Sequence, residues 1–115
     1  MSIKIERLNH TFVKELSIIL SQEIKDEDIH FVTITDCSIT TDLSFCKVYY
    51  TVLDESKKES TQKALDNASS FIRGQLSKRV DIRHTPELKF IYDESIAYGK
   101  KIEEKLNELE LEKND

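Results

Sequence analysis

The chain has 115 residues, which is enough for one hydrophobic core and too few for two. Apolar residues make up 38% of it and charged residues 34%, a balance that excludes a wholly disordered protein. The net charge of −5 argues against a general coat for nucleic acid. No apolar run approaches the roughly 20 residues of a membrane span, and the N-terminus lacks a signal peptide's apolar core. We therefore expect a cytoplasmic protein with no membrane partner.

The first predicted element is a helix over Ile3–Ile24. Its apolar residues recur at steps of three and four and form one stripe on the helix. The stripe consists of Ile5, Leu8, Phe12, Leu16, Ile19 and Leu20. This face is expected to pack on the core, and the acidic cluster that follows is expected to end the helix.

Two strands and a hairpin follow. Val32–Ile39 is rich in β-branched residues and predicts a strand, and a change of parity in its alternation predicts a β-bulge near Asp36. Thr40–Ser44 is the expected hairpin connection to a second strand, Phe45–Leu53. One face of that strand is expected to cover helices, and the other is expected to be open. The open face would present Lys47, Tyr49 and Thr51.

Ser56 and Glu59 fit a capping box and predict the start of the next helix at Ser56. Ser69-Ser70 interrupts the helical preference, because serine hydroxyls offer the backbone competing hydrogen bonds. The apolar stripe resumes slightly out of phase and ends near Val80. These observations predict two helices that meet at a kink over Ala68–Ser70.

Asp81–Thr85 is an expected loop, and Pro86 suits the entrance of a strand, because proline cannot donate to a ladder. Glu87–Tyr92 predicts the third strand. The stripe of a final helix runs from Tyr98 to Leu109, and residues 110–115 are an acidic tail that is expected to fray. The chain is thus predicted to be one α+β domain over residues 1–109, with a three-stranded sheet and helices on one face.

Charge is distributed unevenly along the chain. Residues 1–70 have a balance of −4, residues 71–101 a balance of +3, and residues 102–115 a balance of −4. Phosphate binding depends on the local field more than on the total charge. One basic segment inside an acidic protein therefore favours a selective nucleic-acid binder.

The order of the elements is that of a type II K-homology (KH) fold, and the residues resemble those of the ribosome-binding factor A family. The matching stretches are Val32–Thr35, Thr41–Ser44, Lys47–Tyr49, Ala68-x-x-Phe71-Ile72-Arg73, Leu76, Ile82-Arg83, Pro86-Glu87-Leu88-x-Phe90, Asp93, Ser95, Gly99 and Ile102. Ordinary KH domains clamp nucleic acid with a GXXG loop, and this chain has only Gly74 and Gly99. The family instead has a kinked Ala-x-Gly joint, where this chain has Ala68-Ser69-Ser70.

The resemblance implies a non-enzymatic RNA-binding factor that acts on the small (30S) ribosomal subunit during its late maturation. It implies contact with 16S rRNA near the 5′ end and decoding region, a role in 5′-end processing, and support for growth in the cold. The expected partners are the small subunit and its 16S rRNA, with an assembly GTPase as a candidate further partner. No cofactor is expected, and the protein is expected to be a monomer.

The expected RNA contacts are Arg73, Lys78, Arg79, Arg83, Ser69 and Ser70. Arginine suits this role because its planar fork bonds two phosphate oxygens and its face stacks on unpaired bases. The serines are expected to lie where a second helix begins, and helix N-termini favour phosphate. Each basic residue can instead belong to a solvated helix face, the serines can be plain caps, and Arg83 can fix the strand entrance at Pro86.

Two other functions remain open. The chain can be a protein–protein adaptor that uses the open sheet face or the acidic C-terminal helix, although Tyr49 on that face can also stack on bases. A hydrolase built on Cys37 or Cys46 is a third reading, and nothing local prepares a thiolate there. No CxxC, HxxxH or HExxH spacing is present, so no metal site is expected.

Overall fold

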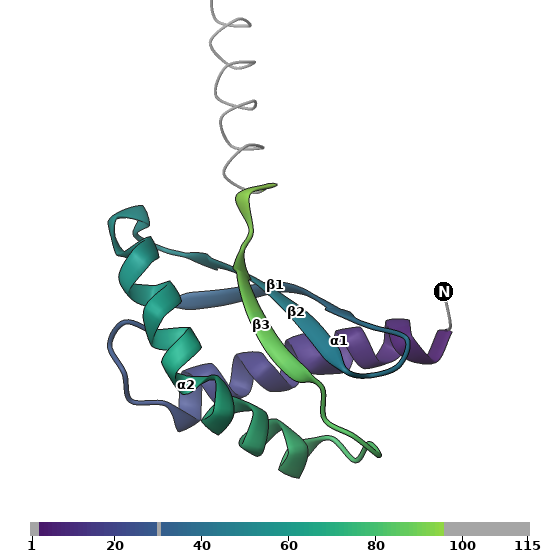
Figure 1. Cartoon of the computed structure of the whole chain (residues 1–115). Coiled ribbons are helices and arrows are strands. Elements are labelled where there is room, and N and C mark those ends of the chain that lie inside the picture. The colour runs from purple at the N-terminus through teal and green to yellow at the C-terminus, as the bar shows by residue number, and fades with distance from the viewer. Residues whose placement is uncertain (1–2, 30, 96–115) are drawn as a thin grey trace, which may run out of the picture.

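The computed structural model describes residues 3–29 and 31–95, which form a three-stranded sheet with two long helices packed on one face (Figure 1). The elements are α1 (Ile3–Ile18), the π-helical turn η1 (Ile19–Glu23), β1 (Val32–Ile39), β2 (Phe45–Val52), the 3-10 turn η2 (Glu55–Lys57), α2 (Lys58–Arg79) and β3 (Glu87–Tyr92). The predicted α+β class is confirmed. The predicted final helix and the tail 110–115 lie outside the described residues.

The apolar stripe of α1 packs this helix along β1. Phe12 and Leu16 are fully buried, and the stripe continues into η1, where Ile19 and Leu20 are also buried. The helical segment ends at Glu23, one residue before the predicted end. A π-turn contains one more residue per hydrogen-bonded ring than an α-turn, so side chains after Ile18 are rotated relative to those of α1.

The sheet has the order β1-β2-β3, with β2 antiparallel to β1 and parallel to β3. The predicted bulge is confirmed, because the β1–β2 register shifts between Ile34 and Asp36. Thr35 is the extra residue, and its hydroxyl donates to Asp93 Oδ2 at 2.7 Å. The bulge allows Ile34 and Cys37 to be buried on the same face although they are three positions apart, a spacing that puts residues on opposite faces of a regular strand.

Buried and exposed side chains alternate along β2 and β3, and the buried ones lie on the face of the sheet that the helices cover. Cys46, Val48 and Tyr50 are fully buried, whereas Lys47 on the opposite face is exposed. The phenol of Tyr50 donates to Gln62 Oε1 of α2, and Gln62 Nε2 donates to the carbonyl oxygen of Phe90 at 2.9 Å. One glutamine therefore connects α2 to both β2 and β3.

The start of α2 differs from the predicted capping box. The side chain of Asp54 accepts hydrogen bonds from the backbone N–H of Ser56 at 3.0 Å and from its hydroxyl at 2.7 Å. The turn η2 follows, and α2 begins at Lys58 without a side-chain cap at Lys57. The prediction of Ser56 as the N-cap is wrong, because the carboxylate of Asp54 is the stronger acceptor.

The predicted pair of helices is one continuous α-helix from Lys58 to Arg79. Its axis changes direction partway along in Figure 1, so a bend replaces the expected joint between two helices. The hydroxyl of Ser69 donates to the carbonyl of Asp66 at 2.9 Å, within its own helix. Such bonds to a preceding carbonyl bend a helix without ending it.

Candidate nucleic-acid interface

Three segments that are distant in sequence meet at one end of the molecule. They are the first turns of α1, drawn in purple in Figure 1, the β1–β2 hairpin, and the loop between α2 and β3. Together they form a groove whose floor is apolar. The groove is lined by Lys4, Ile5, Arg7, Leu8, Thr11, Thr41, Leu43 and Ile82.

The charged side chains that line this groove are all positive. Lys4 and Arg7 are exposed and line it, and Arg83 directly follows Ile82, which also lines it. Its lining contains no carboxylate. An apolar floor with cations at its margin can hold an unpaired base while binding adjacent phosphates.

Sequence reasoning missed Lys4 and Arg7. Both lie on the polar side of an amphipathic helix, where lysine and arginine usually serve as solvated surface. No spacing in the sequence relates α1 to the loop that carries Arg83. Only the folded arrangement places Lys4, Arg7 and Ile82, the residue before Arg83, around one groove.

The hairpin beside the groove is held by Asp42. Its carboxylate accepts hydrogen bonds from the Thr40 hydroxyl at 2.8 Å and from the Ser44 N–H at 3.1 Å, besides one from the Ser44 hydroxyl. These bonds, led by the Ser44 hydroxyl, lower the pKa of Asp42 to about 2. They enclose Leu43, which adopts the left-handed backbone conformation (φ 62°). A non-glycine residue persists in that conformation where its surroundings enforce it, so this wall of the groove is preformed.

Arg73 is occupied within the fold. Its Nε and Nη2 donate to the carbonyl oxygen of Thr85 at 3.1 and 2.7 Å, and the side chain is half-buried. Pro86 is buried directly after this carbonyl. Fixing the entrance of β3 was an alternative role for Arg83, and the structure gives that role to Arg73.

Arg79 is also occupied. Its Nη1 lies 3.2 Å from Glu15 Oε2, its Nε donates to Glu23 Oε1 at 3.1 Å, and its Nη2 bonds the same oxygen. These bonds, led by the one to Glu23, raise the pKa of Arg79. The guanidinium joins the end of α2 to α1 and η1, so its charge is already balanced by carboxylates.

The remaining predicted contacts differ in availability. Lys78 and Arg83 are exposed and form no ion pair within residues 3–29 and 31–95. Ser70 is exposed on α2, whereas the Ser69 hydroxyl is bonded within the helix. Because α2 is continuous, no helix N-terminus lies at these serines, and the expected dipole site for phosphate there is wrong.

Both cysteines lie in the core, away from solvent. Cys37 and Cys46 are free and buried, and a hydrogen bond with Cys46 together with burial raises the pKa of the Cys37 thiol far above its usual range. A protonated thiol is a poor nucleophile. Among the described residues, no group of three His, Cys, Asp or Glu side chains is placed to hold a metal ion. None of the helices in that part of the chain is long and apolar enough to cross a membrane.

Comparison with known proteins shows the family to which the chain is similar. The family model described as ribosome-binding factor A matches residues 4–106. Ribosome-binding factor A of Macrococcus caseolyticus is 42% identical over 114 residues, covering 98% of this chain and 100% of the relative. That of Staphylococcus carnosus is 45% identical over 108 residues, covering 93% of this chain and 94% of the relative.

Solved structures agree on the fold. The crystal structure of ribosome-binding factor A from Thermus thermophilus is 24% identical with a TM-score of 0.70, covering 76% of this chain and 94% of its own. A Thermotoga maritima solution structure of a putative ribosome binding factor A is 23% identical with a TM-score of 0.70, covering 83% of this chain and 92% of its own. The match of family model and relatives over nearly the whole length is decisive. This chain belongs to the ribosome-binding factor A family.

Proposed function

We propose that this protein binds the small ribosomal subunit through its 16S rRNA during late maturation, including processing of the rRNA 5′ end. Family membership is the observation that carries the proposal. A homology model of the Thermus thermophilus relative, with a TM-score of 0.66 to this chain, was fitted into a cryo-EM map of a complex with the 30S subunit. The protein acts in the cytoplasm as a monomer, without a chemical step, and supports growth in the cold. An assembly GTPase is a candidate further partner.

The physical basis of such a role is differential affinity. A binder shifts an equilibrium between two states of a particle only by the difference in its affinity for them. The protein therefore binds the precursor subunit more tightly than the mature one and leaves as maturation completes. No catalytic residue is needed for this action.

The surface that suits rRNA is the groove at the basic end of the molecule. Arg7 lines the groove and Arg83 follows the lining residue Ile82, so both supply exposed cations, and the apolar floor accepts an unpaired base. Lys78 is a further exposed cation on α2, outside the lining. Ser70 remains a candidate contact on α2. Arg73 and Arg79 support this surface from within the fold, by fixing the loop before β3 and the end of α2.

Co-sedimentation with precursor and mature small subunits, at low and moderate salt, tests the proposal. Large subunits serve as the control particle. Phosphate-led binding weakens steeply as salt rises, and each phosphate contact adds to the slope. We expect salt-sensitive binding to small subunits that is stronger for precursors. Equal binding to large and small subunits would contradict the proposal.

Charge reversal then tests the surface. Arg7→Glu combined with Arg83→Glu is expected to weaken binding by about tenfold or more, because two phosphate contacts become repulsive. Lys63→Glu, at an exposed position near the start of α2, makes the same change of charge as Arg83→Glu alone and is the matched control for that single reversal. Equal losses for Arg83→Glu and Lys63→Glu would place the RNA elsewhere on the molecule.

A further inference from the structure

The end of the sheet away from the β1–β2 hairpin carries two large, exposed apolar side chains. Phe31 is 62% exposed and Leu53 is 80% exposed. Val32 and Val52 are register partners in the β1–β2 ladder, so the residues immediately outside that pair lie side by side. Adjacent exposed apolar side chains make this end of the sheet a candidate contact surface for a partner.

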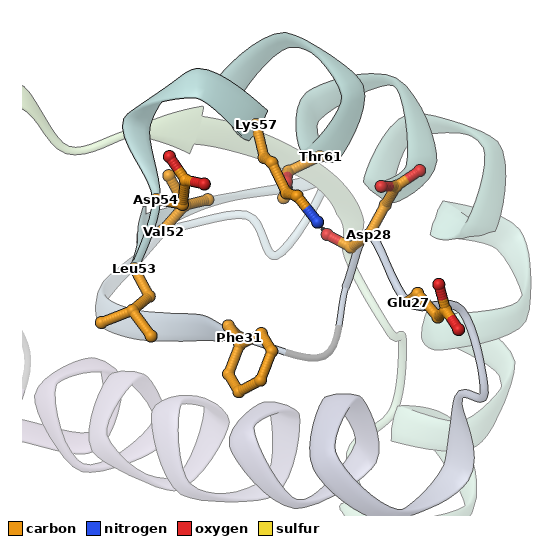
Figure 2. A pocket seen from close by; sticks show the side chains of 8 residues that line it. All are labelled: Glu27, Asp28, Phe31, Val52, Leu53, Asp54, Lys57 and Thr61. Atoms are coloured by element: carbon orange, nitrogen blue, oxygen red, sulfur yellow. Dashed lines mark hydrogen bonds between the residues drawn. The ribbon is translucent and has the colours of Figure 1, made fainter.

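Phe31 and Leu53 lie on the same side of a hollow between the end of the sheet and the start of α2, as Figure 2 shows. The hollow has a volume of about 250 Å³. Small-molecule pockets usually measure about 300–1,000 Å³, so this one suits a single large side chain better than a cofactor. Its lining consists of Glu27, Asp28, Phe31, Val52, Leu53, Asp54, Lys57 and Thr61.

A second hollow adjoins the first and extends it into a groove. It shares Glu27, Phe31 and Lys57 with the first hollow and reaches Ser21 in η1. Phe31 therefore lies between two depressions rather than at the mouth of one. A surface of this shape accommodates an extended segment whose side chains enter on either side of the ring.

Carboxylates surround the groove. Asp26, Glu27, Asp28 and Asp54 line its two hollows, and none of them forms an ion pair within residues 3–29 and 31–95. The lysines among the lining residues, Lys25 and Lys57, balance only part of this charge. The field attracts cationic groups and repels phosphate, so the groove favours a basic peptide over RNA.

Hydrogen bonds hold the walls in place. Thr61 is buried, and its hydroxyl donates to the carbonyl of Asp28 at 2.9 Å. The N–H of Asp28 donates to Asp26 Oδ1 at 2.9 Å, and that of Ile29 donates to the carbonyl of Asp26 at 3.0 Å. A partner therefore meets a surface whose backbone is already ordered, which lowers the entropic cost of binding.

We propose that the groove around Phe31 and Leu53 docks a basic peptide segment of a partner protein, with one large apolar residue entering the hollow between Leu53 and Thr61. Arginines or lysines on either side of that residue pair with the surrounding carboxylates. This surface is separate from the basic groove. Its test does not depend on ribosomal RNA, so its failure leaves the proposed function untouched.

The probe is a seven-residue amidated peptide with a central leucine flanked by arginines and lysines. Two control peptides replace the leucine with serine or the basic residues with glutamates. Amide chemical shifts of the full chain are followed during titration at low salt. We expect saturable shifts around Phe31 and Leu53 with the first peptide, and at least about tenfold weaker binding of both controls.

Variants distinguish binding in the groove from non-specific binding of the peptide elsewhere on the protein. Leu53→Ser and Glu27→Gln are expected to weaken binding of the leucine peptide, by about tenfold for the loss of the apolar contact. Phe71→Ser is the matched control, because Phe71 is 50% exposed and lies on α2, outside the groove. Equal binding of leucine and serine peptides overturns the proposal, and so does the same shift pattern with single-stranded RNA. A dimer that Leu53→Ser dissociates in sedimentation equilibrium overturns it in favour of a second copy of this chain.

Discussion

Arg73 of α2 donates two hydrogen bonds to a single backbone carbonyl, that of Thr85, in the loop that leads into β3. The guanidinium satisfies a backbone acceptor that lies outside the strand ladder, because β3 begins only at Glu87. An arginine expected to contact RNA is therefore a structural residue. Its two bonds fix the loop that also carries the exposed Arg83, two residues before Thr85.

Replacement of Arg73 is expected to act on stability before it acts on binding. Arg73→Met should lower the free energy of unfolding by about 1.5–3 kcal/mol, since both bonds involve a charged donor. Lys78→Met, at an exposed residue of the same helix, should change it by less than about 0.5 kcal/mol. Urea unfolding of the two variants makes the comparison. Equal unfolding midpoints would show that the Thr85 bonds contribute nothing.

Arg79, Glu23 and Glu15 are expected to be energetically coupled. In a double-mutant cycle, Arg79→Met and Glu23→Gln should give less than additive destabilisation, because either change alone breaks the same pair. The coupling should decrease at high salt, since the groups are partly exposed to solvent. Thermal unfolding at two salt concentrations measures it. Strict additivity at low salt would mean that the pair adds no stability.

The hairpin is expected to respond to acid through Asp42. Its folded-state pKa is lowered from 3.8 to about 2, so the carboxylate stabilises the fold above pH 3.8, and this contribution is lost as the pH falls toward 2. The difference in unfolding free energy between wild type and Asp42→Asn should therefore shrink over that window. Glu55→Gln, at an exposed position of η2, is the control substitution. A difference that stays constant with pH would contradict the assigned hydrogen bonds.

Tyr50 is expected to ionise later than an ordinary tyrosine. Burial, followed by the charges of Asp66 and Tyr92, raises its pKa from 10.0 to about 12. The raised value stabilises the fold below pH 10, and this stability is lost as the pH rises through 12. The tyrosinate absorbance of wild type minus that of Tyr50→Phe should therefore titrate near pH 12. A difference curve centred at the usual value would place the phenol in solvent.

The sequence predicted the strands and the bulge because alternation is a local signal. The parity change in Val32–Ile39 has few explanations besides an extra residue, and Thr35 is that residue. The continuity of α2 could not be predicted, because a serine hydroxyl can bond the backbone either within a helix or at a break between two helices. In the structure the Ser69 hydroxyl bonds within its own helix. The roles of Arg73 and Arg79 were beyond local patterns. Their partners are a carbonyl in the following loop and carboxylates on another helical segment.

The edge of β1 has a consequence for how the protein behaves at high concentration. An edge strand exposes a row of unpaired amides and carbonyls, to which another chain can add. In β1 the bulge at Thr35 breaks the regularity of that row, and Asn9 Oδ1 of α1 accepts from the N–H of Ile39 at 3.0 Å. A neighbouring molecule therefore finds no regular ladder there to extend. The edge of β1 is therefore unsuited to the addition of another strand, because of its backbone geometry rather than its charge.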